Sequence, residues 1–360
     1  MLSIGIVGLP NVGKSTLFNA LTNNDILAAN YPFATIEPNT GIVPVPDERL
    51  QKLADLYKTT KIIPAIVTFV DIAGLVAGAS TGEGLGNKFL ANIRQCDAIV
   101  HVVRAFENSD ILRHDNGVVN PQSDIEIINT ELILADIQTI ENRLPKLQKE
   151  SKSQPKVKAT LDYLQTLLQD LQSGTPLSAV ADLDSEAIAD LHLLTAKPVI
   201  YAFNVAEKDL TNSSKIADLQ QLVAPAQTIF ISASLEEELR KLDSDDAAEM
   251  LGEYGMTQLG LNALIDSAYS TLGLQSYLTA GVQEVRAWTI KRGATAPQAA
   301  GVIHGDFEKG FIAAQIMSSA DLLEAGSEAA AKSAGKVRTE GKTYIMQPDD
   351  VVEFRFNVSK

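Results

Sequence analysis

The sequence is poor in cysteine and in long apolar runs. Cys96 is the only cysteine among 360 residues, which excludes an internal disulfide and favours a reducing compartment. No apolar stretch approaches the ~20 residues that a membrane span needs, and no basic segment precedes the first apolar run. We therefore expect a cytoplasmic protein with neither a secretory signal nor a membrane partner.

Basic residues are also scarce, because 30 Lys and Arg oppose 45 Asp and Glu, a formal net charge of −15. The whole acidic excess lies in residues 1–277, which hold 20 basic and 35 acidic residues, whereas residues 278–360 hold 10 of each. Such a surface gains little from attraction to a phosphate backbone. The composition disfavours a broad basic nucleic-acid face, and we expect no sequence-specific DNA binding.

What the sequence does contain is a phosphate-binding loop. Residues 8–15 (GLPNVGKS) fit G-x-x-x-x-G-K-[ST] between an apolar run at residues 2–7 and a helical run. In this pattern backbone N–H groups cradle the phosphates, the lysine reaches the outer phosphates and the hydroxyl holds Mg²⁺. Lys14 is thus also a catalytic candidate and Ser15 a magnesium ligand. The nucleotide-binding candidates of this loop are Asn11, Val12, Gly13, Lys14, Ser15 and Thr16.

A second motif follows the next apolar run. Asp71 and Gly74 fit D-x-x-G, in which the carboxylate orders magnesium's water and the glycine N–H meets the γ-phosphate, a catalytic role. Between the motifs, Thr35 is a candidate magnesium ligand once a triphosphate is bound. Leu75 stands where many small GTPases place the glutamine that orients water. Hydrolysis must then rely on positioning and charge neutralisation, with K⁺ near Asn11 as one candidate, or on a partner's group.

The base-reading motif departs from that of ordinary GTPases. Residues 204–207 (NVAE) stand where GTPases carry N-K-x-D, so that Glu207 is one methylene longer and Val205 replaces the lysine. A carboxylate suits the donors of guanine, whereas a displaced carboxylate would leave adenine to the Asn204 amide, backbone groups and apolar stacking. These residues alone leave both purines open. The loop expected to back the base consists of Ser232, Ala233 and Ser234.

The spacing of apolar residues predicts an α/β protein. Short apolar runs alternate with helical segments up to about residue 121 and return after residue 198, which predicts a mainly parallel sheet. In between, residues 133–147 and 161–171 carry Ile and Leu at spacings of three and four. This spacing predicts two amphipathic helices packed as an antiparallel hairpin, the first kinked or shortened by Pro145.

The motifs together resemble the Obg-like ATPase family, also called YchF, within the translation-factor class of P-loop GTPases. The stretches that carry the resemblance are residues 8–16, 31–40 (YPFATIEPNT), 71–90, 204–207 and 285–311. The resemblance implies a P-loop G domain formed by residues 1–121 and 198–277. It further implies an inserted α-helical coiled-coil domain at residues 122–197 and a C-terminal TGS domain, a ubiquitin-like β-grasp fold, at residues 278–360.

The same resemblance implies a function. It implies a switch protein that binds ATP, prefers it to GTP, hydrolyses it slowly with Mg²⁺ and associates with the ribosome, through its large subunit. Asn11 matches the asparagine that is linked to K⁺-stimulated hydrolysis in related GTPases. Two alternatives stay open, namely a nucleotide-stabilised ribosome-binding scaffold and a GTPase with guanine preference.

Overall fold

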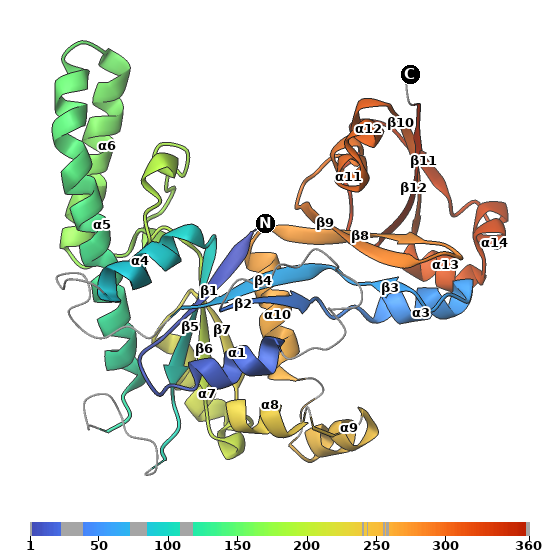
Figure 1. Ribbon diagram of the computed structural model, residues 1–360, viewed down its shortest axis with the longest axis horizontal. Helices are drawn as coiled ribbons and strands as arrows, with labels where there is room; N and C mark the ends of the chain where they lie inside the picture. The colour runs from blue at the N-terminus through green and yellow to red at the C-terminus, as the bar shows by residue number, and fades with distance from the viewer. Residues whose placement is uncertain are drawn as a thin grey trace. The chain divides into compact units, whose positions relative to one another are not determined.

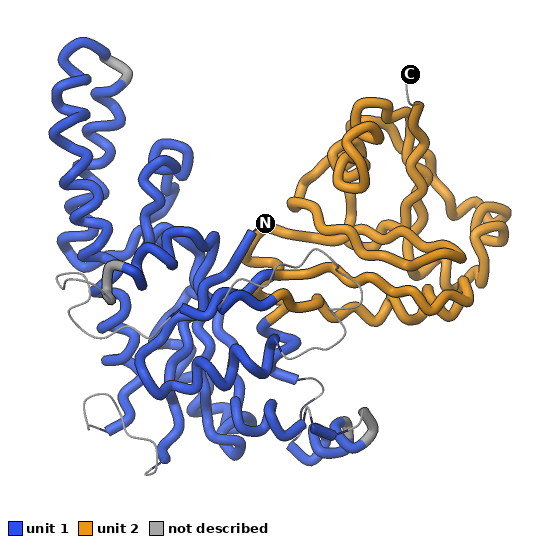
Figure 2. Tube along the Cα trace, viewed as in Figure 1, with its two compact units in different colours: residues 1–23, 35–41, 68–264 blue, residues 24–34, 42–67, 265–360 orange. Residues whose placement is uncertain are grey.

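The computed structural model describes residues 2–22, 39–72, 85–108, 118–239, 241–242, 244–254, 256 and 259–357. They form two compact units, shown in different colours in Figure 2. The first unit holds the described residues within 1–23, 35–41 and 68–264, and the second those within 42–67 and 265–360. No helix in the described part of the chain is long and apolar enough to cross a membrane.

A six-stranded sheet has the order β2-β4-β1-β5-β6-β7 (Figure 1), and all of it except residues 42–44 of β2 and 66–67 of β4 belongs to the first unit. From β4 to β7 all neighbouring strands are parallel, which confirms the predicted α/β fold with a mainly parallel sheet. Parallel strands end at one edge of the sheet, so the loops after these strands meet there. The strands are β1 (Ser3–Val7), β2 (Thr40–Pro44), β4 (Ile66–Asp71), β5 (Ala98–Arg104), β6 (Val199–Asn204) and β7 (Gln227–Ile231).

Helices join these strands, as expected for a parallel sheet. Helix α1 follows the phosphate-binding loop, and α8 follows β7. The helices that begin in this unit are α1 (Lys14–Thr22), α4 (Leu85–Gln95), α5 (Pro121–Ser151), α6 (Pro155–Gln172), α7 (Ser213–Gln221), α8 (Ala233–Leu239), α9 (Ser244–Glu253) and α10 (Gly260–Thr271). Three short 3-10 turns are η1 (Leu177–Ala179), η2 (Ala189–Leu191) and η3 (Glu207–Asp209).

Helices α5 and α6 run side by side as the predicted helical hairpin (Figure 1). The helix was expected to be kinked or shortened at Pro145, and Pro145 lies inside α5 without ending it, so the shortening does not occur and the kink stays a prediction. The neighbouring Leu144 and Leu147 pack against α6, and we attribute the continuity of the helix to this packing, which offsets the one lost backbone hydrogen bond. The predicted apolar positions all join one core, namely Ile133, Ile137, Ile140, Leu144, Leu147, Leu161, Leu164, Leu168 and Leu171.

A buried carboxylate ties this hairpin to the segment that returns to the sheet. Asp136 on α5 is fully buried and accepts hydrogen bonds from Leu194 N (2.8 Å), Thr195 N (2.7 Å) and Thr195 Oγ1 (2.8 Å). Burial raises the pKa of Asp136, although the three hydrogen bonds oppose the shift. The hairpin is therefore anchored to the segment that leads into β6 through a satisfied polar group rather than through apolar packing alone.

The second unit contains a mixed sheet with the order β11-β10-β12-β8-β9-β3. Helix α11 packs on this sheet, where Tyr277 is fully buried and its hydroxyl donates to Ala299 O at 2.9 Å. A helix packed on a mixed sheet is the arrangement expected of a β-grasp fold. The strands are β3 (Ile62–Ile63), β8 (Leu274–Ala280), β9 (Val285–Lys291), β10 (Phe311–Ser318), β11 (Arg338–Glu340) and β12 (Asp350–Phe356), and the helices are α3 (Glu48–Tyr57), α11 (Ala296–Ile303), α12 (Gly305–Lys309), α13 (Ser319–Ala325) and α14 (Glu328–Ser333).

Residues 42–67 mark the main difference between these compact units and the expected domains. They belong to the second unit, where Ile62 pairs in parallel with Val285 and the Arg49 guanidinium donates to Pro348 O at 2.7 Å. Strand β8 also begins four residues before the expected boundary at residue 278. The chain divides into two compact units, whereas the expected domains are three. The boundaries 1–121 with 198–277, 122–197 and 278–360 therefore stay a prediction.

Candidate nucleotide-binding site

The phosphate-binding loop links β1 to the N-terminus of α1. Asn11 and Gly13 have positive φ values of 62° and 95°, and the loop ends where Lys14 opens the helix. A Cβ on Gly13 would lie 2.3 Å from Asn204 Nδ2, so only glycine fits at this position. Ser15 is exposed in the first turn of α1, where helix N–H groups and the helix dipole favour an anion.

Lys14 and Asp71 come together across the edge of the sheet. The Lys14 ammonium donates a hydrogen bond to the Asp71 carboxylate at the end of β4, and both side chains are largely buried. A hydroxyl at a helix N-terminus and a carboxylate at a strand end are oxygen donors that suit Mg²⁺, so Ser15 and Asp71 fit the ion. The other predicted phosphate-site residues, Thr35 and Gly74, lie outside the described residues, as does Leu75.

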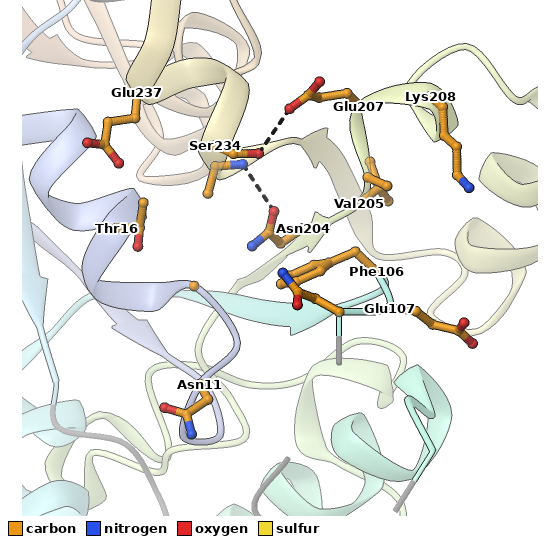
Figure 3. Close-up of a pocket in the computed structure, with 14 residues that line it drawn as sticks. Asn11, Thr16, Phe106, Glu107, Asn204, Val205, Glu207, Lys208, Ser234 and Glu237 are labelled. Atoms are coloured by element: carbon orange, nitrogen blue, oxygen red, sulfur yellow. Dashed lines mark hydrogen bonds between the residues drawn. The ribbon is translucent and has the colours of Figure 1, made fainter. Parts of the chain in front are cut away.

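A cavity of about 670 Å³ lies beside this loop, between the ends of β5 and β6 and the start of α8 (Figure 3). This volume is in the range of sites that hold a nucleotide-sized ligand. Among the predicted residues, Val12, Lys14, Ser15 and Ser232 do not line it. Those that do are Asn11, Gly13, Thr16, Asn204, Val205, Glu207, Ala233 and Ser234.

Asn204 holds the two sides of this cavity together. Its Nδ2 donates to Val12 O at 3.0 Å. Its Oδ1 accepts from Ala233 N at 3.1 Å, the bond drawn at Asn204 in Figure 3. The side chain is buried, so both bonds are shielded from water. Asn204 therefore joins the loop at residues 8–15 to residues 232–234, which are predicted to back the base.

Glu207 and Ser234 form a second polar link in the same cavity. Ser234 Oγ donates to Glu207 Oε1 at 3.3 Å, and Ser232 Oγ shares a hydrogen bond with Ser234 Oγ at 3.0 Å. The hydroxyl of Tyr254 donates to Glu207 Oε2 at 3.3 Å. Val205, the position of the GTPase lysine, is buried and packs in an apolar core with Phe203.

Sequence reasoning missed the wall of the cavity that follows β5. Phe106, Glu107 and Asn108 line this wall, and the Arg104 guanidinium lies 4.7 Å from the centre of the Phe106 ring. Arg104 Nε also donates to Phe106 O at 3.1 Å, which fixes the backbone beside the ring. The available signal was position, because β5 lies next to β6 in a parallel sheet and its carboxyl end must reach the same edge. Lys208 and Glu237 were missed as well.

Glu236, two residues beyond Ser234, is a buried carboxyl group at the back of this site. It is 2% exposed, its Oε1 accepts from Leu261 N at 3.3 Å, and its Oε2 has no hydrogen-bond partner among the described residues. Burial raises the pKa of Glu236 to about 7, against the opposing effect of bonds from Gly260 and Leu261. Glu236 thus connects α8 to the first residues of α10.

The raised pKa of Glu236 predicts a pH-dependent stability. The folded protein holds the proton of Glu236 more tightly than the unfolded chain does. The stability that this proton contributes is therefore fully present below pH 4.5 and is lost as the pH rises to about 7. The loss amounts to at most about 3 kcal/mol. Glu236→Gln should therefore lose less stability than the wild type between about pH 5 and pH 8, measured by urea unfolding. Glu238→Gln, an exposed neighbour on α8, is the control, and equal pH dependence in all three proteins would contradict this role.

Known proteins of similar sequence decide the family. Residues 3–143 match a family described as 50S ribosome-binding GTPase, and residues 274–357 match the YchF-GTPase C-terminal family, described as of unknown function. The chain is 52% identical to the ribosome-binding ATPase YchF of Pasteurella multocida, over 98% of this chain and 99% of the relative. The chain belongs to the YchF family. Its identity to the YchF protein of Bacillus subtilis is 49%, over 99% and 100% of the two chains.

Solved structures agree with this YchF membership. The structure of the Schizosaccharomyces pombe YchF GTPase has a TM-score of 0.87 and 40% identity, covering 98% of this chain and 97% of the other. A GTP binding protein from Pyrococcus horikoshii, with a TM-score of 0.60 and 20% identity, shares the fold. The names of these relatives include both ATPase and GTPase. The choice of purine in this YchF chain must therefore be argued from its own residues.

Proposed function

We propose that this YchF chain is a magnesium-dependent ATPase of the cytoplasm, whose bound nucleotide controls its association with the ribosome through the large subunit. The names of the curated relatives support ATP and the ribosome as ligands. The observation that carries the adenine assignment is the state of Glu207. Each of its carboxylate oxygens accepts a hydrogen bond from a protein hydroxyl, which fixes the plane of the carboxylate and disfavours turning both oxygens toward the two donors of guanine.

The phosphates occupy the loop and the start of α1 in this proposal. Backbone N–H groups of residues 11–16 bind them, and the Lys14 ammonium exchanges its carboxylate partner Asp71 for the outer phosphates. Ser15, Asp71 and Thr35 would hold Mg²⁺, which would neutralise phosphate charge. Lys14 opens α1 beside this loop, so the exchange moves only the end of its side chain.

Hydrolysis is slow in this proposal because the chain lacks one component. Leu75 cannot orient water as a glutamine does, which leaves Lys14 and the N–H of Gly74 to stabilise the negative charge on the γ-phosphate. K⁺ beside Asn11 is a further source of positive charge. A slow reaction suits a switch, since the triphosphate state then persists long enough to bind a partner.

The base lies between apolar and amide groups. Phe106 offers an aromatic face and Val205 an apolar surface on the cavity wall. Asn204 Oδ1 has a second lone pair beside its bond to Ala233 N, which can accept from the 6-amino group of adenine. Ser232, Ala233 and Ser234 back the base in this arrangement.

Phe106→Ala should weaken the binding of ATP by about five- to 150-fold, because stacking of a base on an aromatic ring contributes about 1–3 kcal/mol. GTP should weaken by a similar factor, since stacking does not distinguish the purines. Phe106→Tyr keeps the ring and should bind both nucleotides nearly as the wild type does. Titration calorimetry measures all three, and wild-type affinity in Phe106→Ala would contradict the stacking role.

Ribosome sedimentation in the presence of ATP, a non-hydrolysable ATP analogue or ADP tests the switch. We expect the fraction of the protein bound to the ribosome to differ between the two triphosphates on one side and ADP on the other. Equal binding in all three states and without nucleotide would favour the scaffold alternative. In that alternative, residues 278–360 and the α5/α6 hairpin bind the ribosome and nucleotide only stabilises the fold.

A guanine-preferring GTPase is the second candidate, because Glu207 does line the cavity and the matched N-terminal family is described as a GTPase. It predicts tight GTP binding and no effect of Glu207→Asp on the choice of purine. The first proposal predicts that shortening this side chain changes its hydroxyl contacts and hence the choice.

A further inference from the structure

Three separate segments of the first unit meet at the carboxylate of Glu207. Glu207 opens η3 after β6, Ser234 lies in the first turn of α8, and Tyr254 follows α9. Ser234 Oγ donates to Oε1 (Figure 3) and Tyr254 OH donates to Oε2, each at 3.3 Å. The two oxygens are therefore held by two donors on different elements, which fixes the plane of the carboxylate as well as its position.

Both donors are themselves constrained. Ser234 shares a hydrogen bond of 3.0 Å with Ser232, which is buried. The negative charge of Glu207 is the largest of the causes that raise the pKa of Tyr254, so its hydroxyl keeps the proton that it donates. Tyr254 lies outside the set of residues that line the cavity, so it acts on a ligand only through Glu207.

We propose that Tyr254, together with Ser234, is a positioning residue that holds the Glu207 carboxylate away from the purine and so determines the preference for adenine. Guanine presents two donors, N1–H and the 2-amino group, which need both oxygens of one carboxylate directed at them. Adenine presents an unprotonated N1, an acceptor that a nearby carboxylate repels. A carboxylate turned toward two hydroxyls loses the first interaction and avoids the second.

This inference rests on the proposed preference for ATP, and the affinities for ATP and GTP test both. Tyr254→Phe removes one donor and keeps the ring, so the carboxylate gains freedom to reach guanine. We expect GTP affinity to rise while ATP affinity stays or falls, which reduces the ATP preference by about tenfold or more for one lost hydrogen bond to a charged group. Tyr163→Phe is the matched control. It also removes one hydrogen-bonded tyrosine hydroxyl, because Tyr163 on α6 accepts from Asp184 N at 2.8 Å, but Tyr163 forms no hydrogen bond with Glu207 among the described residues. Its ATP preference should equal that of the wild type.

A second substitution separates positioning from packing. In a Glu207→Gln background the clamped carboxylate is gone, so adding Tyr254→Phe should not change the purine preference further. A general loosening of the site would lower both affinities in either background. If Tyr254→Phe fails to fold, Ser234→Ala decides, because loss of the other hydroxyl should shift the preference in the same direction.

The outcomes of these titrations are distinguishable. If the wild-type protein binds GTP more tightly than ATP, the proposed function itself is overturned. If the wild type prefers ATP but Tyr254→Phe has the same ratio of ATP affinity to GTP affinity, the positioning role of Tyr254 and Ser234 is overturned and the proposed function is not. Ser234→Ala takes the place of Tyr254→Phe in this comparison if Tyr254→Phe does not fold. The positioning role would also be overturned if Tyr254→Phe changed the ratio of ATP affinity to GTP affinity equally in the wild-type background and in the Glu207→Gln background.

Discussion

Lys14→Ala should lower the affinity for ATP by about a hundredfold or more, and its hydrolysis by at least as much, since charge stabilisation in a buried site is a large effect. Lys14 is 9% exposed, and its ammonium already bonds Asp71 at the edge where the loop, α1 and β4 meet. Without it, the outer phosphates lose their only cation from the loop. Calorimetry measures the affinity, and phosphate release measures the turnover.

The matched control is Lys52→Ala, which removes an exposed lysine whose partner Glu48 lies one helical turn away. It should leave both quantities unchanged, because exposed ion pairs of this kind contribute little. The Lys14 variant should also bind the ribosome equally with ATP and with ADP. Wild-type nucleotide dependence of ribosome binding in this variant would contradict the switch, and undiminished ribosome binding without any nucleotide would favour the scaffold.

Asn204→Ala should have the second largest effect, because one side chain supplies two buried hydrogen bonds. Val12 O and Ala233 N would both lose their bond to it, and each buried polar group left without a partner costs about 1–3 kcal/mol. We expect a loss of about 2–4 kcal/mol in the free energy of unfolding and at least a tenfold loss in ATP affinity. Urea unfolding and calorimetry measure the two effects.

Two other asparagine variants serve as comparisons for Asn204→Ala. Asn212→Ala removes the N-cap of α7, where the side chain accepts from Lys215 N at 3.2 Å, and should cost about 1 kcal/mol without changing nucleotide affinity. Asn204→Asp keeps the acceptor for Ala233 N but loses the donor to Val12 O. Its second carboxylate oxygen faces Val12 O with no hydrogen between them in a buried site, so this variant should be at least as destabilised as Asn204→Ala. Equal stability of Asn204→Ala and Asn212→Ala would contradict the joining role.

The phosphate half of the site could be read from the sequence because its parts are contiguous. A loop with fixed glycines between a strand and a helix places residues 11–16 by local geometry alone. The base half was only partly readable. Phe106 and Tyr254 belong to no short pattern, and what brings them to the site is the register of β5 against β6 and the path of the chain after α9.

The fold shows the same division. The spacing of apolar residues predicted α5 and α6 because each helix buries one stripe, and it predicted the parallel strands because each is a short buried run. It did not predict that residues 42–67 join the second unit, since the pairing of Ile62 with Val285 depends on contacts distant in sequence. The shortening expected at Pro145 does not occur for a similar reason, because the packing of Leu144 and Leu147 on α6 cannot be predicted from local helix propensity.

Calorimetric titration of the protein, freed of bound nucleotide, with ATP and GTP in the presence of Mg²⁺ tests the central claim most directly. The state of Glu207, whose oxygens are bonded to Ser234 and Tyr254, predicts tighter binding of ATP than of GTP. Tighter binding of GTP, or no binding of either triphosphate, would contradict it.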